Sequence, residues 1–511
     1  MSRAAGAIAH HSGALQSWFH SWARRSLARV SGWFVVPRPA LAARLTLVAL
    51  ALVLQNLLEL PRTVFSGVIG VTLTGVLVVA LLAASLVLLL AAVGQRPPRW
   101  RWPYRRGVQI LALCLTLAVV PLGVAQCVKI GAASLSPPQY SNDGTTLDHF
   151  AAQQLIKGHN PYAASNIVDA VRFLHQDAAF TTPLRQGEFA NRAPGDYPTE
   201  AERRAVFARN ADHPGGPVEF ESRVSYPALA FLPLVPFVWA GLPSVVVFFA
   251  LFLLALAVVL IRGAPRDARL WLALLLLADT PLLNATLVGD LDVFYILLLF
   301  VAWRWFRRPL VATVAFGLAL AAKQLAWFFA PFYLLYVWRR AGLRAAGVRL
   351  AGGVALFAVI NAPFIVANPA AWLRGVLAPQ LDPMFPLGSG LVRLSLAGVL
   401  PLPSSGVYLT LEALAIVACL FVYWRERRPA AGTGFVLPVL PLWFAWRSLT
   451  TYFYFVALPA LALALADGAE NASVGAERGE RDAGDAGDAG DAGDDAQDVR
   501  RATASGVTRD E

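Results

Sequence analysis

Charged residues are scarce in this sequence. They make up 15% of its 511 residues, whereas hydrophobic residues make up 57%. A soluble domain carries about 25% charged residues. With a mean hydropathy of +0.56 and apolar stretches of roughly 17–25 residues recurring along the chain, the composition excludes a soluble protein. Lipid cannot satisfy open backbone groups, and the alternation typical of a transmembrane β-barrel is missing. We therefore predict an all-α, polytopic bundle of about 11–13 transmembrane helices in the cell membrane.

Cysteine is equally rare. Cys114, Cys127 and Cys419 lie within apolar segments, with no paired spacing and no histidine neighbours. Neither a disulfide framework nor a metal site is indicated, and we interpret them as small core residues. Metal-ligand spacing is also missing from three histidines of the polar stretch, His149, His159 and His175. We expect these histidines at the surface or in turns, and we predict no metal ligands.

The net charge of +11 is a clue to topology. In a soluble chain it would suggest a nucleic-acid partner, but here the basic residues cluster in short loops, which lie in the cytoplasm of multi-pass proteins. These loops occupy residues 262–266, 304–308, 339–344 and 425–428. Placing them inside puts the turns near residues 290, 323 and 447 outside, on the same face as the stretch around Asp143.

The pattern divides the chain into four parts. Residues 1–42 form a basic cytoplasmic N-terminus, and 43–107 hold two transmembrane helices and a basic cytoplasmic loop. Residues 108–466 form the transmembrane core, which includes an extracytoplasmic loop domain at 134–225. Residues 467–511 are acidic and rich in Asp, Gly and Ala, so we predict a disordered cytoplasmic tail.

The stretch 226–261 decides the topology of everything after it. Its prolines suggest two short helices, which would invert all later spans and place four basic loops outside. A broken or re-entrant arrangement with an odd number of crossings keeps those loops inside, and we prefer it.

Two carboxylates open the polar stretch. Asp143 and Asp148 are five residues apart, so on one helix they point in different directions. Either one could act as a general base whose pKa is raised by partial burial. Alternatively, Asp143 caps a helix that begins near Thr145. Further on, Gly158 and Asn160-Pro161-Tyr162 indicate a helix stop followed by a turn.

Ionisable residues within the later apolar sequence form a second group of candidates. Lys323 costs several kcal/mol there unless it is paired or faces a polar cavity, so it either contacts a phosphate or snorkels to a helix end. Arg447 offers a forked donor for phosphate oxygens, or it anchors the chain at the membrane interface. Asp290 and Asp292 could position an acceptor, bind a divalent ion, pair with Lys323, or simply form a polar turn.

Together these features resemble the GT-C superfamily of integral-membrane glycosyltransferases. The resemblance rests on an external Asp, an amphipathic helix, the Gly-x-Asn-Pro-Tyr turn at 158–162, and Tyr226-Pro227 at the return to the membrane. The Lys-centred segment 318–332 is similar to that of the bacterial polyprenol-phosphate-mannose-dependent mannosyltransferases. The resemblance covers roughly residues 108–466. Two departures are Tyr-Pro-Ala at 226–228 in place of Tyr-Pro-Pro, and the two spans that precede the Asp loop.

The resemblance implies an enzyme that moves a sugar, mannose in the named branch, from a polyprenyl-phosphate donor to a hydroxyl of a lipid, glycan or protein acceptor. The reaction takes place on the extracytoplasmic face, because nucleotide sugars are confined to the cytoplasm. It implies Asp143 as catalytic base, with Asp148 in reserve, and inversion by direct displacement. The substrate-binding candidates are Lys323, Arg447, Asp290, Gln324, Asn160 and Tyr162. No cofactor is predicted with certainty, although a divalent cation stays open.

Two other classes remain as alternatives. In a secondary transporter or a lipid or glycan flippase, the intramembrane Asp, Lys and Arg residues would line a substrate path. An inverted repeat would favour transport, whereas the single long polar loop favours the enzyme. An acyl- or phosphotransferase acting on lipid-linked glycans is the third class, and the missing His-centred motif argues against it.

Overall fold

A computed structural model describes residues 38–58, 66–95, 105–213, 217–426 and 428–468, which are mostly helical, as predicted. Within these ranges, seven helices are long and apolar enough to cross a membrane: Pro39–Leu57, Gly70–Val93, Arg106–Ala133, Val246–Gly263, Leu343–Ala367, Ser405–Arg425 and Thr451–Gly468. The pair Arg266–Ala278 and Thr280–Leu287, bent by 56°, makes eight if it counts as one span. Length and composition therefore support a multi-pass membrane protein.

This number is smaller than the 11–13 helices expected from the sequence. Several apolar runs form helices that are too short for a hydrocarbon core that needs about 20 residues. They include α13 (Asp292–Arg304), α14 (Pro309–Ala322) and α15 (Leu325–Ala341), with 13, 14 and 17 residues. The physical reason is that the chain turns at the polar residues between them.

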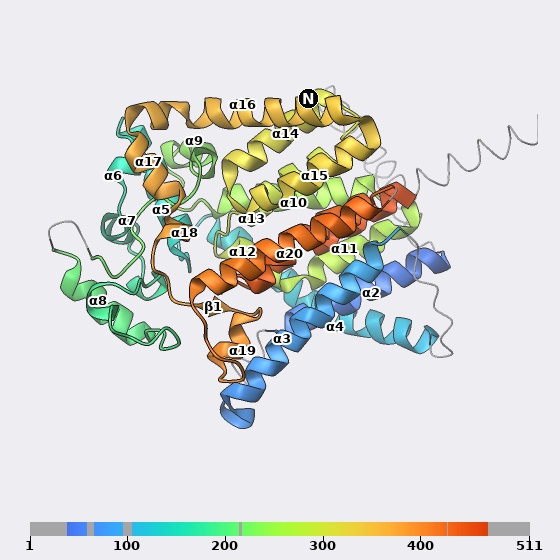
Figure 1. Ribbon diagram of the computed structural model, residues 1–511, viewed down its shortest axis with the longest axis horizontal. Coiled ribbons are helices and arrows are strands. Elements are labelled where there is room, and N and C mark those ends of the chain that lie inside the picture. Colours follow the sequence, from blue (N-terminus) through green and yellow to red (C-terminus); the bar gives the residue numbers. More distant parts are fainter. Residues whose placement is uncertain (1–37, 59–65, 96–104, 214–216, 427, 469–511) are drawn as a thin grey trace, which may run out of the picture. The chain divides into compact units, whose positions relative to one another are not determined.

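The first three described helices pack on one another. They are α2 (Pro39–Leu57), α3 (Ser66–Val93) and α4 (Arg105–Ala133), shown in blue in Figure 1. Arg44 of α2 donates to the backbone oxygens of Ala92 (2.6 Å) and Gly94 (2.7 Å), which holds α2 against the end of α3. Cys114 and Cys127 are exposed on α4, so the prediction that they are core residues is wrong.

Residues 134–225 form a layer of short helices rather than one long loop. The layer contains α5 (Asp143–Ile156), α6 (Pro161–Ala164), α7 (Ile167–Leu174), η2 (Ala178–Phe180), η3 (Gly187–Phe189) and α8 (Glu200–Asn210). Its own core includes Phe150 of α5, Ile167 of α7, Phe207 of α8 and Phe220 of the return loop. Helix α7 buries its apolar face, which includes Ile167, Val171 and Leu174. That the layer lies outside the membrane stays a prediction.

The remaining elements follow in chain order: η4 (Ala228–Ala230), η5 (Leu232–Leu234), α9 (Val235–Trp239), α10 (Val246–Gly263), η6 (Arg266–Ala268), α11 (Arg269–Ala278), α12 (Thr280–Leu287), α13 to α15, α16 (Leu343–Ala367), α17 (Pro369–Val376), α18 (Ala378–Leu381), β1 (Leu387–Gly388), α19 (Val392–Leu396), α20 (Ser405–Arg425), α21 (Ala431–Val436), η7 (Leu437–Val439), η8 (Pro441–Phe444), β2 (Arg447–Ser448) and α22 (Thr451–Tyr454). The two strands pair in parallel. Contacts within the chain are concentrated in two units, residues 1–464 and 465–511.

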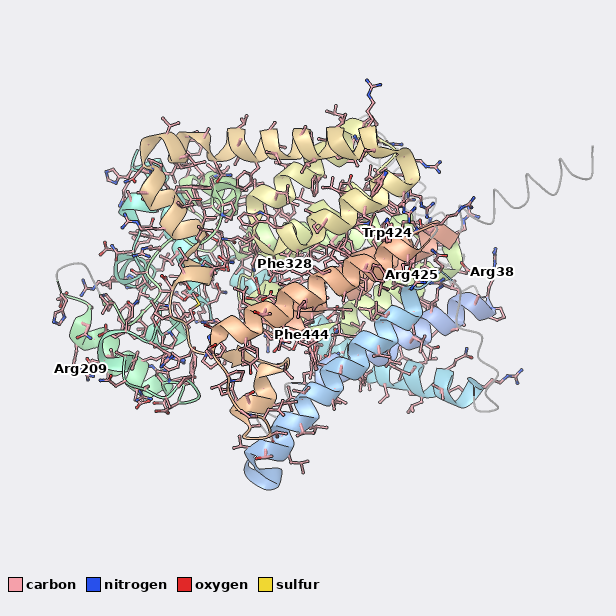
Figure 2. All side chains as sticks on the ribbon, in the orientation of Figure 1. Arg38, Arg209, Phe328, Trp424, Arg425 and Phe444 are labelled. Carbon is pink, nitrogen blue, oxygen red and sulfur yellow. The ribbon has the colours of Figure 1, made fainter. Side chains whose placement is uncertain are left out.

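The basic loops of unit 1 lie together at one end of its helices. Arg339 donates from Nη2 to the Trp424 backbone oxygen (2.5 Å), which joins the ends of α15 and α20. Arg349 donates from Nη2 to the Phe306 oxygen (3.0 Å), which joins the start of α16 to the α13–α14 loop. Figure 2 shows Trp424 and Arg38 at this end, while α8 lies at the opposite end. The charge clusters that predict topology are thus gathered in space as well.

The stretch after Tyr226 begins and ends beside the layer of short helices. Tyr162 of α6 donates from its hydroxyl to the Tyr226 oxygen (2.7 Å), and the Val245 N–H donates to the Tyr140 hydroxyl (2.9 Å). Helix α10 then runs from this point toward the basic end. Residues 226–245 therefore make no net crossing of the bundle, which is the broken arrangement that the basic loops favour. The sidedness in a membrane stays a prediction. Residues 1–37, and residues 469–511 of the tail predicted at 467–511, lie outside the described residues.

Candidate functional site

Helix α5 begins at Asp143, and its N-cap is Asn142. The Asn142 Oδ1 accepts a hydrogen bond from the Thr145 N–H (2.7 Å). Asp143 is half-buried and accepts from two backbone N–H groups, that of Gly144 at Oδ1 (3.0 Å) and that of Thr182 at Oδ2 (3.0 Å). The capping role that the sequence allowed for Asp143 belongs to its neighbour. The carboxylate of Asp143 is instead tied to the loop after η2.

Asp148 points in a different direction, as the five-residue spacing predicts. It is 3% exposed, and its Oδ1 has no hydrogen-bond partner among the described residues. Burial raises the pKa of Asp148 well above its usual value, and the charge of Lys323 opposes this shift. Burial thus disfavours the charged form of Asp148. It faces the Lys323 side of α5 rather than the Asp143 side.

Glu221 is the carboxyl that lies next to Asp143, and the sequence analysis missed it. Thr182 connects the two: its N–H donates to Asp143, and its backbone oxygen accepts from the Glu221 N–H (3.0 Å). Glu221 is 7% exposed. Burial and the charge of Asp143 raise its pKa to about 8, and the charge of Arg447 opposes this shift. Asp143 and Glu221 thus form the carboxyl pair of this site, in place of Asp143 and Asp148.

No local signal marks Glu221. It precedes the Tyr226-Pro227 motif in an ordinary mixed segment. Only the pairing of the return loop with residues 182–184, where the Leu184 N–H donates to the Glu219 oxygen (2.7 Å), brings it to Asp143. That pairing joins segments about forty residues apart, which a local pattern does not encode.

Arg447 lies close enough to this carboxyl pair for its charge to act on Glu221. Parallel pairing of Leu387 with Arg447 and of Gly388 with Ser448 fixes its backbone. The Arg447 side chain is half-buried, and its Nη1 has no hydrogen-bond partner among the described residues. The Arg447 charge acts on Glu221 and, together with the Lys323 charge, on the Tyr452 hydroxyl. The predicted outer-face candidates Asp143, Lys323 and Arg447 therefore surround one region.

Lys323 lies at the end of α14 in a buried ion pair. It is 5% exposed, and its Nζ lies 2.9 Å from Asp292 Oδ1 and 3.4 Å from Asp290 Oδ1. Its Nζ is also 5.2 Å from the centroid of the Tyr226 ring. Of the roles left open for Asp290 and Asp292, this arrangement is the pairing with Lys323. A buried charge that keeps two carboxylate partners is stabilised by its own protein.

A close backbone approach holds the ion pair against α5. Gly289 has a φ of +84°, and the Thr145 hydroxyl donates to its backbone oxygen. A Cβ at this position would lie 2.9 Å from Thr145 Cγ2. The Asn142 side chain donates to the neighbouring Val288 oxygen (3.3 Å). The residues that cap α5 thus also position the turn that carries Asp290.

The other three substrate-binding candidates hold the frame of the site. Gln324 donates from Nε2 to the backbone oxygens of Ser225 (2.5 Å) and Val376 (2.7 Å). Asn160 accepts from the Tyr162 N–H (3.1 Å) and caps α6. It follows Gly158 and His159, and the φ of +81° at Gly158 confirms the predicted helix stop. The Tyr162 hydroxyl is engaged by the return loop. Contact of these three residues with a substrate stays a prediction.

The histidines divide between interior and surface. His149 is buried, with its Nδ1 2.9 Å from the Tyr140 hydroxyl, and burial lowers its pKa to about 4. The prediction that it lies at the surface or in a turn is wrong, because α5 is covered on both sides. His159 and His175 are exposed, as predicted. No group of three or more potential metal ligands occurs in the described part of the chain.

Comparison of the chain with protein-family models, with curated proteins and with solved structures gave no match. The chemistry open to the site follows from its arrangement. Asp143 offers a base, Glu221 a neutral carboxyl beside it, and Arg447 an Nη1 group without a hydrogen-bond partner among the described residues. Such a set can take a proton from a hydroxyl and stabilise an anionic leaving group.

We expect Lys323→Met to lower the stability of the folded protein by about 3–5 kcal/mol, because it leaves Asp292 buried without its counter-charge. The double variant Lys323→Met/Asp292→Asn should regain most of this loss. Thermal unfolding in detergent measures both effects. Lys129→Met, which removes an exposed lysine from α4, is the control. If Lys323→Met and Lys129→Met were equally stable, the ion pair would have no structural role.

Glu221 should make stability depend on pH. Its pKa is raised from 4.5 to about 8 in the folded state, so the folded protein binds more protons than the unfolded chain between these values. Stability therefore falls as pH rises through this window, by at most about 1.4 kcal/mol per unit. Glu221→Gln, which cannot ionise, should flatten the dependence of the unfolding temperature between pH 6 and 8. Identical pH profiles for variant and wild type would refute the raised pKa.

Proposed function

We propose that this protein is a membrane glycosyltransferase that moves a sugar from a polyprenyl-phosphate donor to a hydroxyl of a lipid, glycan or protein acceptor on the outer face of the membrane. The observation that carries the proposal is the meeting of Asp143, Glu221 and Arg447 at the end of the helices opposite the basic loops. A base, a neutral carboxyl and a cation with free donors are what such a transfer needs. The resemblance to the GT-C superfamily supplies the donor class.

The leaving group determines the role of Arg447. When the sugar departs, the polyprenyl phosphate gains negative charge, which a forked guanidinium stabilises by charge-assisted hydrogen bonds. The unpartnered Nη1 of Arg447 is available for this contact. Lys323 holds Asp290 and Asp292 through its ammonium, so it acts on the phosphate through its field rather than as the first contact. We therefore assign the first contact with the phosphate to Arg447 instead of Lys323.

The acceptor determines the role of Asp143. Its carboxylate takes the hydroxyl proton as the acceptor oxygen attacks the sugar carbon and the bond to the donor phosphate breaks. The neighbouring Glu221 is neutral below about pH 8, so it does not compete as a nucleophile. One working base with a neutral neighbour favours direct displacement with inversion. Asp148 is buried on the other side of α5, where it interacts electrostatically with Lys323.

We expect Asp143→Asn to lower sugar transfer by roughly 10²–10⁴-fold, the usual range for loss of a general base. The assay is incubation of the purified protein in lipid with radiolabelled polyprenyl-phosphate mannose, followed by separation of labelled products. The matched control is Asp212→Asn, which removes an exposed carboxylate that pairs with Arg172 on the surface.

The two variants should elute as the same folded species in size-exclusion chromatography. Full activity of Asp143→Asn would remove it as the base. Movement of the labelled donor lipid across the bilayer without any covalent transfer would overturn the enzyme in favour of a transporter.

A further inference from the structure

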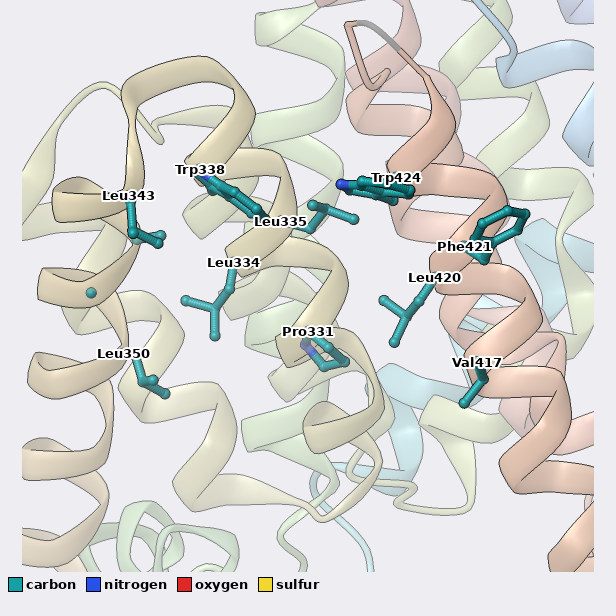
Figure 3. Close-up of a pocket in the computed structure, with 12 residues that line it drawn as sticks. Pro331, Leu334, Leu335, Trp338, Leu343, Leu350, Val417, Leu420, Phe421 and Trp424 are labelled. Atoms are coloured by element: carbon teal, nitrogen blue, oxygen red, sulfur yellow. The ribbon is translucent and has the colours of Figure 1, made fainter.

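An apolar groove lies at the basic end of the bundle, far from the proposed site. It has a volume of about 590 Å³ and runs along α15 between α16 and α20. Figure 3 shows α15 as its floor and the two longer helices as its walls. All of its lining residues are apolar: Pro331, Leu334, Leu335, Trp338, Leu343, Ala346, Gly347, Leu350, Val417, Leu420, Phe421 and Trp424. Both walls are candidate membrane spans, so the groove opens toward lipid.

Three residues of the two walls leave the groove open. Gly347 on α16 has no atom within 4 Å of an added Cβ, so this wall is thinned where a larger side chain would fit. Leu350, one turn further on, and Val417 on the facing wall are exposed. From Pro331 to Trp338 the groove extends about 10 Å along α15. That is room for part of a hydrocarbon chain.

Three arginines stand at one end of the groove. Arg339, Arg344 and Arg425 each follow a lining residue directly in sequence, and all three are exposed. None of them forms an ion pair with a described carboxylate. Arg339 is held beside Trp424, with its Cζ 5.9 Å from the ring centroid. The groove therefore ends in a positive charge that the protein leaves without a carboxylate partner.

We infer that this groove binds an anionic phospholipid, with the headgroup phosphate at the three arginines and an acyl chain between α16 and α20. An apolar channel that ends in unpaired arginines complements both parts of such a lipid. The tryptophans Trp338 and Trp424 at the same end suit the boundary between headgroups and chains.

The bound phosphate is distinct from that of the proposed sugar donor. Helix α15 begins at Leu325, directly after the Lys323-Gln324 turn, and its length from Leu325 to Trp338 corresponds to about 20 Å. A phosphate at the arginine end is therefore out of reach of Lys323. The inference consequently stands or falls independently of the proposed function.

The test is native mass spectrometry of the full chain with phosphatidylglycerol and phosphatidylcholine of matched chains. We expect the wild type to retain phosphatidylglycerol preferentially. Arg339→Gln/Arg344→Gln/Arg425→Gln should weaken its binding by roughly 100-fold, since each basic residue near a membrane surface contributes to attraction of anionic lipid. Arg262→Gln/Arg266→Gln/Arg308→Gln, which removes three exposed arginines of other basic loops, should leave it unchanged.

A second pair of variants tests the groove itself. Gly347→Leu should weaken binding of both lipids, whereas Gly131→Leu, at an equally open position on α4, should not. Equal retention in the two arginine triples, or in the two glycine variants, would overturn the inference. Displacement of phosphatidylglycerol by polyprenyl phosphate would assign the groove to the donor lipid, and a dimer that closes the groove would assign it to a second copy; either result also overturns it.

Discussion

The buried charge of Lys323 determines how the helices are arranged at the end of the bundle that holds the proposed site. An ammonium at the end of an apolar helix is tolerated only with partners, and Asp290 and Asp292 supply them. Because Lys323 must meet these two carboxylates, α13 begins, α14 ends and α15 begins at the same level of the bundle. Gly289 and Thr145 then bring α5 against the same level, and Asp143 comes with it. The short helices are therefore a consequence of where the charge is neutralised.

Charge is divided between the two ends of the described bundle. The basic loops meet at one end through bonds such as those from Arg339 to Trp424 and from Arg349 to Phe306. Most of the buried carboxyls, including Asp148, Glu221 and Asp292, gather at the other. A phosphate-bearing lipid can be attracted at either end, but only the carboxyl end also holds a base. This is why the proposed chemistry and the proposed phospholipid belong to different ends of α15.

Much of this could be predicted from local sequence. Helix α7, the stop at Gly158 and the shared region of Asp143, Lys323 and Arg447 follow from periodicity, turn chemistry and the distribution of arginine. The features that could not be predicted depend on contacts between segments that are far apart in the sequence. Glu221 reaches Asp143 only through the Thr182 bridge, and His149 is buried only because α5 is covered on both faces. The helix number was overestimated because apolar runs broken by a charge resemble full spans in sequence.

The most direct test of the account is the sidedness of its two ends. In a background with the three native cysteines replaced by serine, single cysteines at the exposed positions Ser141, Ser404 and Gly263 would be treated with a membrane-impermeant maleimide on intact cells. The account predicts labelling of Ser141→Cys and Ser404→Cys from outside, and of Gly263→Cys only after the membrane is permeabilised. Labelling of Gly263→Cys from outside, with Ser141→Cys protected, would contradict it.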